Sequence, residues 1–249
     1  MTTYMVEIKQ CQKCTKVFKK LSVGSCNTIG AVKYTDGFMH GLMYDMGCPL
    51  VTCPYCMEEF WSEDLLTIAF LDPYEMSNNS EYESVLSAVK IGMYDYEGAM
   101  RRGFWKTKSQ EKYIRIRAWW SSNHIHRPQA SLGVKAELAL KEMRRKSIEY
   151  PESLPDEPRL REAWDQRRLT EDPENLRKER IANLQKLLEL HDTEDTDDII
   201  IRCEILRELE WFDECLKLIK NSFCDEYPQI ITVIKKLAEA ENNQVALIE

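Results

Sequence analysis

Residues 48–61, CPLVTCPYCMEEFW, contain the cysteine spacing that decides the fold of the N-terminal part of the chain. Cys53 and Cys56 form a C-x2-C pair, and Cys11 and Cys14 form a second one. A C-x2-C turn, called a knuckle here, points two thiolates toward one position, and two knuckles complete a tetrahedron around zinc. We therefore expect one zinc ion with these four cysteines as its ligands.

Four thiolate ligands predict a structural zinc ion rather than a catalytic one. Four cysteines close the coordination shell, whereas a catalytic zinc keeps one position open for water or substrate. Phe18 follows the first knuckle, and Phe60 and Trp61 follow the second, so we expect aromatic side chains to cover the metal. A pair of redox dithiols is the weaker interpretation, because the chain lacks a thioredoxin-like βαβ context.

The other cysteines are expected to lie outside the metal site. Cys26 and Cys48 could substitute as ligands, but neither belongs to a knuckle. Cys203 and Cys215 lie on or near apolar helix faces and are expected to be small core residues. The total of nine cysteines is odd, which fits a disulfide framework poorly.

Composition is that of a globular protein with reduced thiols. The chain has 249 residues, of which 43% are hydrophobic and 31% charged, and its net charge of -8 argues against coating nucleic acid with the whole surface. The sequence contains neither an apolar run long enough to cross a membrane nor a signal-peptide pattern. We therefore expect a cytoplasmic location and no membrane span.

Turn signals and apolar spacing predict an α+β fold in two parts. Residues 1–72 are expected to form a small β-rich zinc ribbon, with strands at Ala31–Tyr34 and Leu50–Thr52 and a hairpin turn at Asp36-Gly37. Residues 73–249 are expected to form a mostly helical body. Within it, residues 128–175 form a charged, proline-interrupted connector, and residues 176–249 form tetratricopeptide-like helices. The expected helices cover 81–102, 109–123, 134–148, 158–169, 174–190, a segment capped by Thr196 or Asp197, a segment from near Trp211, and 228–240.

Residues 101–120, RRGFWKTKSQEKYIRIRAWW, mix basic and aromatic side chains. Such a mixture is typical of nucleic-acid platforms, but the helical spacing also favours burial of the tryptophans in the core, and both interpretations stay open. We take five residues as candidate binding residues: Arg115, Arg117, Trp119, Trp120 and Trp211.

Charge is unevenly distributed along the chain. Residues 100–180 contain 20 Lys and Arg against 13 Asp and Glu, whereas residues 181–249 contain 7 against 16. The two segments could attract each other, the basic one could face an acidic partner, or both could form ordinary solvated helix faces. The segment His124-Ile125-His126 is expected to be a solvated loop. Since no nucleotide-binding, hydrolase or metalloprotease motif is present, we expect no enzymatic activity.

Three segments in this order resemble a family of uncharacterised bacterial proteins: CNTIGAVKYTDGF (26–38), LVTCPYCMEEFW (50–61) and YIRIRAWWSSN (113–123). Members of that family have an N-terminal zinc-ribbon-like module followed by tetratricopeptide-like helices. The resemblance supports Cys11, Cys14, Cys53 and Cys56 as the metal set and implies no activity. Residues 199–219, IIIRCEILRELEWFDECLKLI, resemble a tetratricopeptide-type helix pair, with Glu210-Trp211 where a glycine turn is common.

Taken together, these features favour a structural-zinc protein that acts as a protein–protein interaction module or adaptor. The binding groove is expected where the helices near 199–240 meet the tryptophan-containing helix near 119. Three alternatives remain. One is nucleic-acid binding through the ribbon and the basic middle segment, and the second is a toxin antagonist whose acidic C-terminal third suits a basic partner. The third is an enzyme, which an open zinc position or a polar pocket would support.

Overall fold

The computed structural model divides the chain into two compact units. Unit 1 comprises Met1–Ala31 and His40–Gly92, and unit 2 comprises Val32–Met39 and Met93–Glu249. This division differs from the expected boundary after residue 72, because residues 32–39 belong to the helical unit. The structure describes residues 3–41, 47–71, 81–89, 91–92, 95–124, 127, 172–191, 195–223 and 228–248. The helices expected at 134–148 and 158–169, and most of the connector 128–175, lie outside the described residues.

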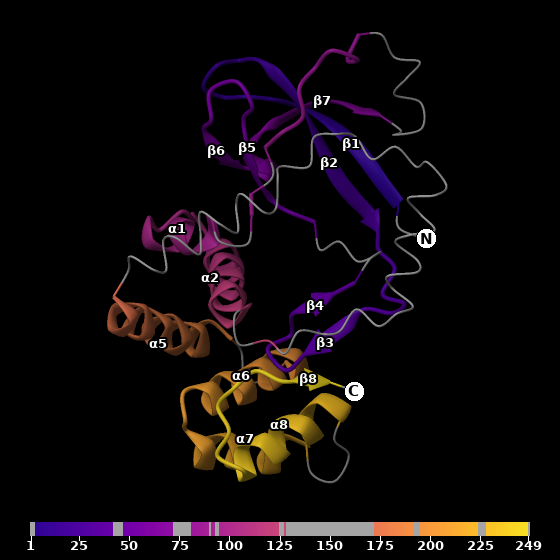
Figure 1. The fold of residues 1–249 in the computed structure, drawn as a ribbon. Coiled ribbons are helices and arrows are strands. Elements are labelled where there is room, and N and C mark those ends of the chain that lie inside the picture. The colour runs from indigo at the N-terminus through magenta and orange to yellow at the C-terminus, as the bar shows by residue number, and fades with distance from the viewer. Residues whose placement is uncertain are drawn as a thin grey trace. The chain divides into compact units, whose positions relative to one another are not determined.

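The main sheet of unit 1 has three antiparallel strands in the order β2-β1-β7 (Figure 1). They are β1 (Thr3–Gln10), β2 (Val17–Ser25) and β7 (Leu66–Leu71). Val6 and Ile8 of the central strand are buried, with one residue between them, as the period-2 geometry of a strand requires. The first knuckle is the loop between β1 and β2, so the sheet holds Cys11 and Cys14 at one end of a hairpin.

A second, shorter hairpin carries the other knuckle. Its strands are β5 (Leu50–Thr52) and β6 (Glu59–Trp61), which pair in register from Leu50 and Trp61 to Thr52 and Glu59. A single turn of 3-10 helix, η1 (Ser62–Asp64), then leads into β7. The strand expected at Leu50–Thr52 is confirmed with its predicted bounds.

The helix expected over 81–102 is found only in part. Among its described residues, 95–101 are helical as α1 (Asp95–Arg101), 81–84 form a turn, and Ser87 and Val89 form isolated β-bridges. Upstream, the N–H of Lys19 donates to the carbonyl of Leu86, and the N–H of Ala88 donates to the carbonyl of Lys19. The segment therefore forms hydrogen bonds with backbone groups at the open edge of β2. The helical spacing of apolar residues in the sequence does not reveal these hydrogen bonds.

Unit 2 contains a small sheet formed by distant parts of the chain. β3 (Val32–Tyr34) pairs with the C-terminal β8 (Leu247–Ile248), and after a tight turn the chain continues into β4 (Met39–His40). The expected turn at Asp36-Gly37 is confirmed. Gly37 has a φ of 78°, and its N–H donates to the carbonyl of Tyr34.

Three of the remaining helices of unit 2, α2, α5 and α6, start at a side-chain cap. The hydroxyl of Thr107 caps α2 (Lys108–Asn123), and the carboxylate of Asp172 caps α5 (Pro173–Leu190). The cap of α6 (Thr196–Glu208) is Asp195, not the expected Thr196 or Asp197, because its carboxylate accepts from two backbone N–H groups of the first turn. The last two helices are α7 (Phe212–Phe223) and α8 (Gln229–Glu239).

Two buried clusters hold these helices together. Cys203 and Cys215 are core residues, as expected, in a cluster of α6, α7 and α8 that also contains Ile219 and Ile234. A second cluster joins α2, α5 and α6 around Trp119, which is 0% exposed. Its ring packs with Leu184, Leu187 and Ile205 at the place where we expected a groove. Trp119 is therefore a core residue here, and a binding groove at this place stays a prediction.

The arrangement of small sheets and helices confirms the α+β class. No helix in the described ranges is long and apolar enough to span a membrane.

Candidate metal centre

The two knuckles have the same backbone hydrogen bonds. In the first, the N–H of Thr15 donates to the carbonyl of Cys11 (3.0 Å), and the N–H of Cys11 donates to the carbonyl of Lys16 (2.9 Å). In the second, Met57 donates to Cys53 and Cys53 donates to Glu58, each at 2.9 Å. Two segments with different neighbouring sequences therefore adopt one local structure, which is set by the C-x2-C spacing.

The residue after each second cysteine adopts a left-handed backbone conformation. Thr15 has a φ of 61° and Met57 a φ of 57°. For a residue with a Cβ atom this conformation costs about 1 kcal/mol or more, and glycine adopts it without steric cost. Each knuckle thus retains a strained residue directly beside a candidate ligand.

Replacing Met57 with glycine is expected to stabilise unit 1 by about 0.5–1 kcal/mol, because the relieved strain exceeds the added entropy of the unfolded chain. The Met57 side chain is 62% exposed, so little packing is lost. The gain should appear as a higher denaturant midpoint of the metal-loaded protein. Thr15→Gly is the matched comparison and should gain less, because the Thr15 hydroxyl donates to the carbonyl of Cys14 (2.7 Å). A Met57→Gly protein less stable than the parent would contradict the strain argument.

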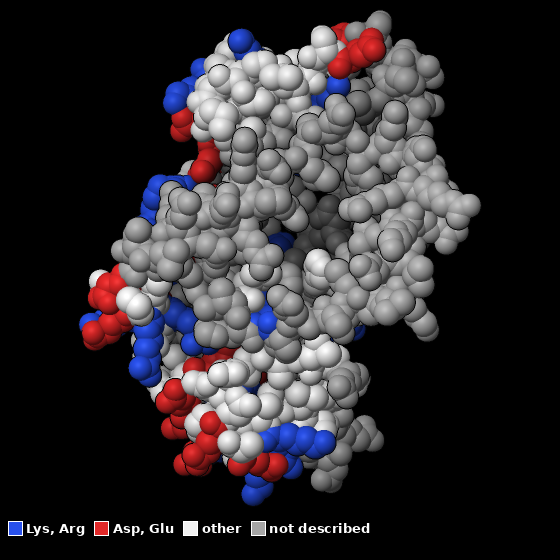
Figure 2. All heavy atoms as spheres, viewed as in Figure 1, with Lys and Arg blue, Asp and Glu red and all other residues white. Residues whose placement is uncertain are grey.

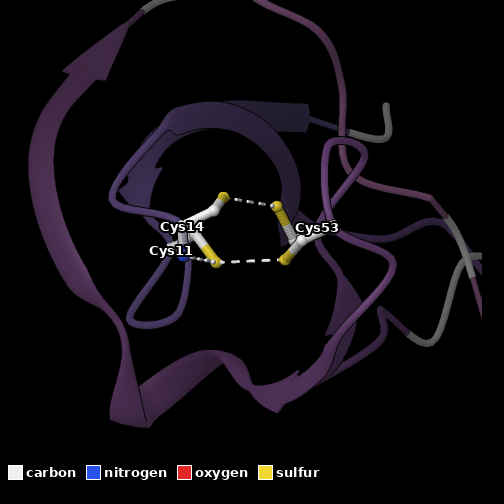
Figure 3. Close-up of side chains that lie close together, drawn as sticks. Cys11, Cys14 and Cys53 are labelled. Carbon is white, nitrogen blue, oxygen red and sulfur yellow. Dashed lines mark hydrogen bonds between the residues drawn. The ribbon is translucent and has the colours of Figure 1, made fainter.

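The four knuckle cysteines converge on one position. Their Sγ atoms all lie within 4.8 Å of one another. The Cys11 and Cys56 sulfurs are 3.6 Å apart, and the Cys14 and Cys53 sulfurs are 3.7 Å apart. Figure 3 shows Cys11, Cys14 and Cys53 pointing toward one another from two loops. Metal–sulfur bonds of about 2.3 Å in a tetrahedron require sulfurs about 3.8 Å apart, so this donor set fits one structural metal ion.

The electrostatics of the cluster favour a cation at its centre. Burial alone would raise the pKa of the Cys11 thiol, but the backbone N–H groups of Cys14 and Lys13 outweigh it and bring that pKa to about 7. Burial raises the pKa of Cys53 to about 12, against the N–H groups of Tyr55 and Cys56. Four negative sulfurs this close repel one another, so a bound metal ion is what would keep all four ionised.

Apolar and ionic contacts join the two knuckles around the sulfurs. Phe18 is fully buried and packs with Val51, Leu65 and the buried cysteines, and Phe60 packs against the same cluster. This arrangement agrees with the expected aromatic cover, although Trp61 lies outside this cluster. On the surface, Lys13 of the first knuckle forms an ion pair with Glu58 beyond the second. The side chain of Gln12 donates to the carbonyl of Asp64.

The two other cysteines of unit 1 are not part of the described cluster. Cys26 is exposed, and the Sγ of Cys48 donates to the carbonyl of Leu50 at 3.0 Å. Across the described residues, the knuckle set is the group of cysteine, histidine and acidic side chains placed to share a metal ion.

The candidate binding residues are largely committed to contacts within unit 2. The indole of Trp119 donates to Glu208 (2.8 Å), and that of Trp120 donates to the carbonyl of Asp36 (2.8 Å). The guanidinium of Arg117 lies over the Trp120 ring, and that of Arg115 bonds Glu111. Of the five residues, Trp211 is the exposed one. The basic-aromatic segment is thus mainly a packing element.

The structure also contains a buried polar network that the sequence did not predict. Asp36 and Glu208 are both 0% exposed, and the amide of Asn123 donates to both carboxylates (3.1 and 2.9 Å). Arg127 pairs with Asp36, and Arg180 pairs with Glu208 (2.6 Å). Burial raises the pKa of Glu208 to about 7, although Arg180 and Trp119 oppose this. The network joins four separate chain segments inside unit 2.

Charge on the helical unit is mixed rather than of one sign. On the face drawn in Figure 2, acidic and basic side chains both appear over the C-terminal helices. Within unit 2, Lys112 pairs with Asp198 and Arg101 pairs with Glu179.

Comparisons of the chain with protein-family models, with curated proteins and with solved structures find no match.

Proposed function

We propose that the four knuckle cysteines bind one zinc ion and that the chain acts as a protein–protein interaction module built on this structural metal. A tetrahedral set of four thiolates is typical of zinc. The closed shell leaves no coordination position for water or substrate, so the ion would act on folding rather than on catalysis. The four converging sulfurs support the metal part of this proposal.

The observation that carries the interaction part is an apolar strand on the metal-stabilised unit. Leu66, Ile68 and Phe70 of β7 are 60%, 44% and 65% exposed. Single exposed apolar residues are ordinary on protein surfaces, but three in a strand of six residues form a patch that water solvates poorly. β7 is also an edge of the sheet β2-β1-β7. Large apolar side chains at an accessible edge are typical of surfaces that bind proteins.

Affinity capture with the zinc-loaded 249-residue chain tests this proposal. Partners captured by the parent protein and identified by mass spectrometry should be lost with Phe70→Lys, because a charge placed in the patch opposes its desolvation. Ile29→Lys is the matched control, since Ile29 is 83% exposed in unit 1 but lies outside the strand. Zinc content is measured for each variant to show that the centre is intact. Equal capture by the parent and Phe70→Lys would exclude β7 as the contact surface.

A further inference from the structure

Three helices of unit 2 enclose a hollow that belongs to neither the metal centre nor the apolar strand. Its volume is about 330 Å³, which lies at the lower end of the range for small-molecule sites. α1, α2 and α5 supply its walls. The lining residues are Glu97, Met100, Ala118, Ser122, Pro173, Leu176, Arg177, Glu179, Arg180 and Asn183.

The hollow exists because α2 has two small residues on one face. Ala118 and Ser122 are four positions apart, so they lie one helical turn from each other and both line the space. Met100, Leu176 and Pro173 add apolar surface on the other walls. The body of a molecule held here would therefore contact mainly carbon atoms.

Most polar groups in the walls already have partners. Glu179 accepts from Arg101 (2.8 Å), and Arg180 pairs with Glu208 (2.6 Å). Asn183 exchanges hydrogen bonds with Arg115, and Glu97 also has an interaction of its own. Arg177 is exposed and, within the described part of the chain, forms no ion pair. Arg177 is thus a cation of the walls that a ligand can reach, while Glu97 contributes a carboxylate whose Oε1 is buried.

We propose that this hollow binds a small organic carboxylate, with its apolar body against Met100, Ala118 and Leu176 and its carboxylate at Arg177. The guanidinium of arginine matches the planar carboxylate and forms charge-assisted hydrogen bonds with it. Inorganic phosphate has no apolar part to contact the carbon atoms of the lining. It also needs several hydrogen-bond donors, whereas the hollow offers the guanidinium of Arg177.

Ligand-observed NMR on the 249-residue chain tests the charge and the apolar body of the ligand separately. The probes are hexanoate, hexylammonium, 1-hexanol and inorganic phosphate. Hexanoate is expected to bind with a Kd of about 0.1–1 mM, which corresponds to the affinity of a small ligand that fills a modest site. The other three probes should bind at least about tenfold more weakly. Equal binding of hexanoate and hexylammonium would overturn the proposal. It would also be overturned if hexanoate does not bind at a concentration about tenfold above the upper expected Kd.

Paired variants then locate the binding. Arg177→Gln should weaken hexanoate at least fivefold, whereas Lys178→Gln, the adjacent position whose lysine pairs with Glu174, should leave it unchanged. Ser122→Leu should abolish binding by filling the hollow, and Ser109→Leu, an exposed position on the same helix, should not. A circular dichroism spectrum of each variant confirms its fold. Hexanoate binding that persists in a folded Ser122→Leu protein would exclude the hollow as the site.

Discussion

Replacing Cys53 with serine is expected to release the metal and unfold unit 1, while the helices of unit 2 remain formed. Cys53 is fully buried at the meeting point of the two hairpins, so serine would leave three ligands and a polar hydroxyl in an apolar cluster. Metal binding contributes directly to folding free energy in small modules of this kind. The expected loss is on the order of 5 kcal/mol, more than a small β-rich core is expected to supply by itself.

Hydrogen exchange and metal analysis measure this result together. In the metal-loaded parent, one metal ion per chain and slow exchange in β1 and β2 are expected. Both should disappear in Cys53→Ser and in the parent after chelation, while amides of α6 and α8 stay protected. Cys48→Ser is the control, because Cys48 lies five residues from Cys53 but bonds a carbonyl outside the cluster. Retention of one tightly bound ion by Cys53→Ser, with β1 and β2 still protected, would contradict the four-cysteine centre.

The four-cysteine cluster was predictable because its determinants are local. Each knuckle is fixed by two cysteines three positions apart, and the hydrogen bonds that shape it lie within six consecutive residues. The helices around Trp119 and Cys203 were predictable for a similar reason, since their apolar spacing repeats along the chain. The sequence also left open whether the tryptophans were core or surface, and the burial of Trp119 favours the core.

Other features depend on residues that are distant in sequence. β1 and β2 contain lysine and glutamate side chains that are largely shielded from water, because Lys9 and Lys20 both pair with Glu7, so their pattern does not resemble a half-buried strand. The polar network of unit 2 is hidden for the same reason. Asp36, Asn123 and Glu208 are ordinary polar residues in a sequence, and such side chains are normally exposed. Their burial follows only from the packing of segments more than 80 positions apart.

Replacing Asp36 with alanine is expected to destabilise unit 2 by about 3–5 kcal/mol. Asp36 is 0% exposed, and its partner Arg127 is almost fully buried, with its guanidinium over the Phe38 and Tyr34 rings. Removing the carboxylate leaves a buried guanidinium without its counter-charge and an Asn123 amide without one acceptor. Breaking one partner of a buried pair costs more than the pair contributes, because the remaining charge is not solvated. Denaturant unfolding followed by tryptophan fluorescence measures the loss.

Two comparison variants separate burial from the loss of an ion pair as such. Glu174→Ala removes a carboxylate of the same unit from an exposed i,i+4 pair with Lys178, and its cost should stay below about 0.5 kcal/mol. The double variant Asp36→Ala/Arg127→Met removes both charges and keeps an apolar chain against Phe38. It should be more stable than Asp36→Ala alone, because no buried charge is left unpaired. If Arg127→Met instead lowers the free energy of unfolding further, the pairing with Arg127 is not what Asp36 contributes. The carboxylate of Asp36 would then act through its other hydrogen bonds, including the one from the N–H of Phe38 at 3.1 Å.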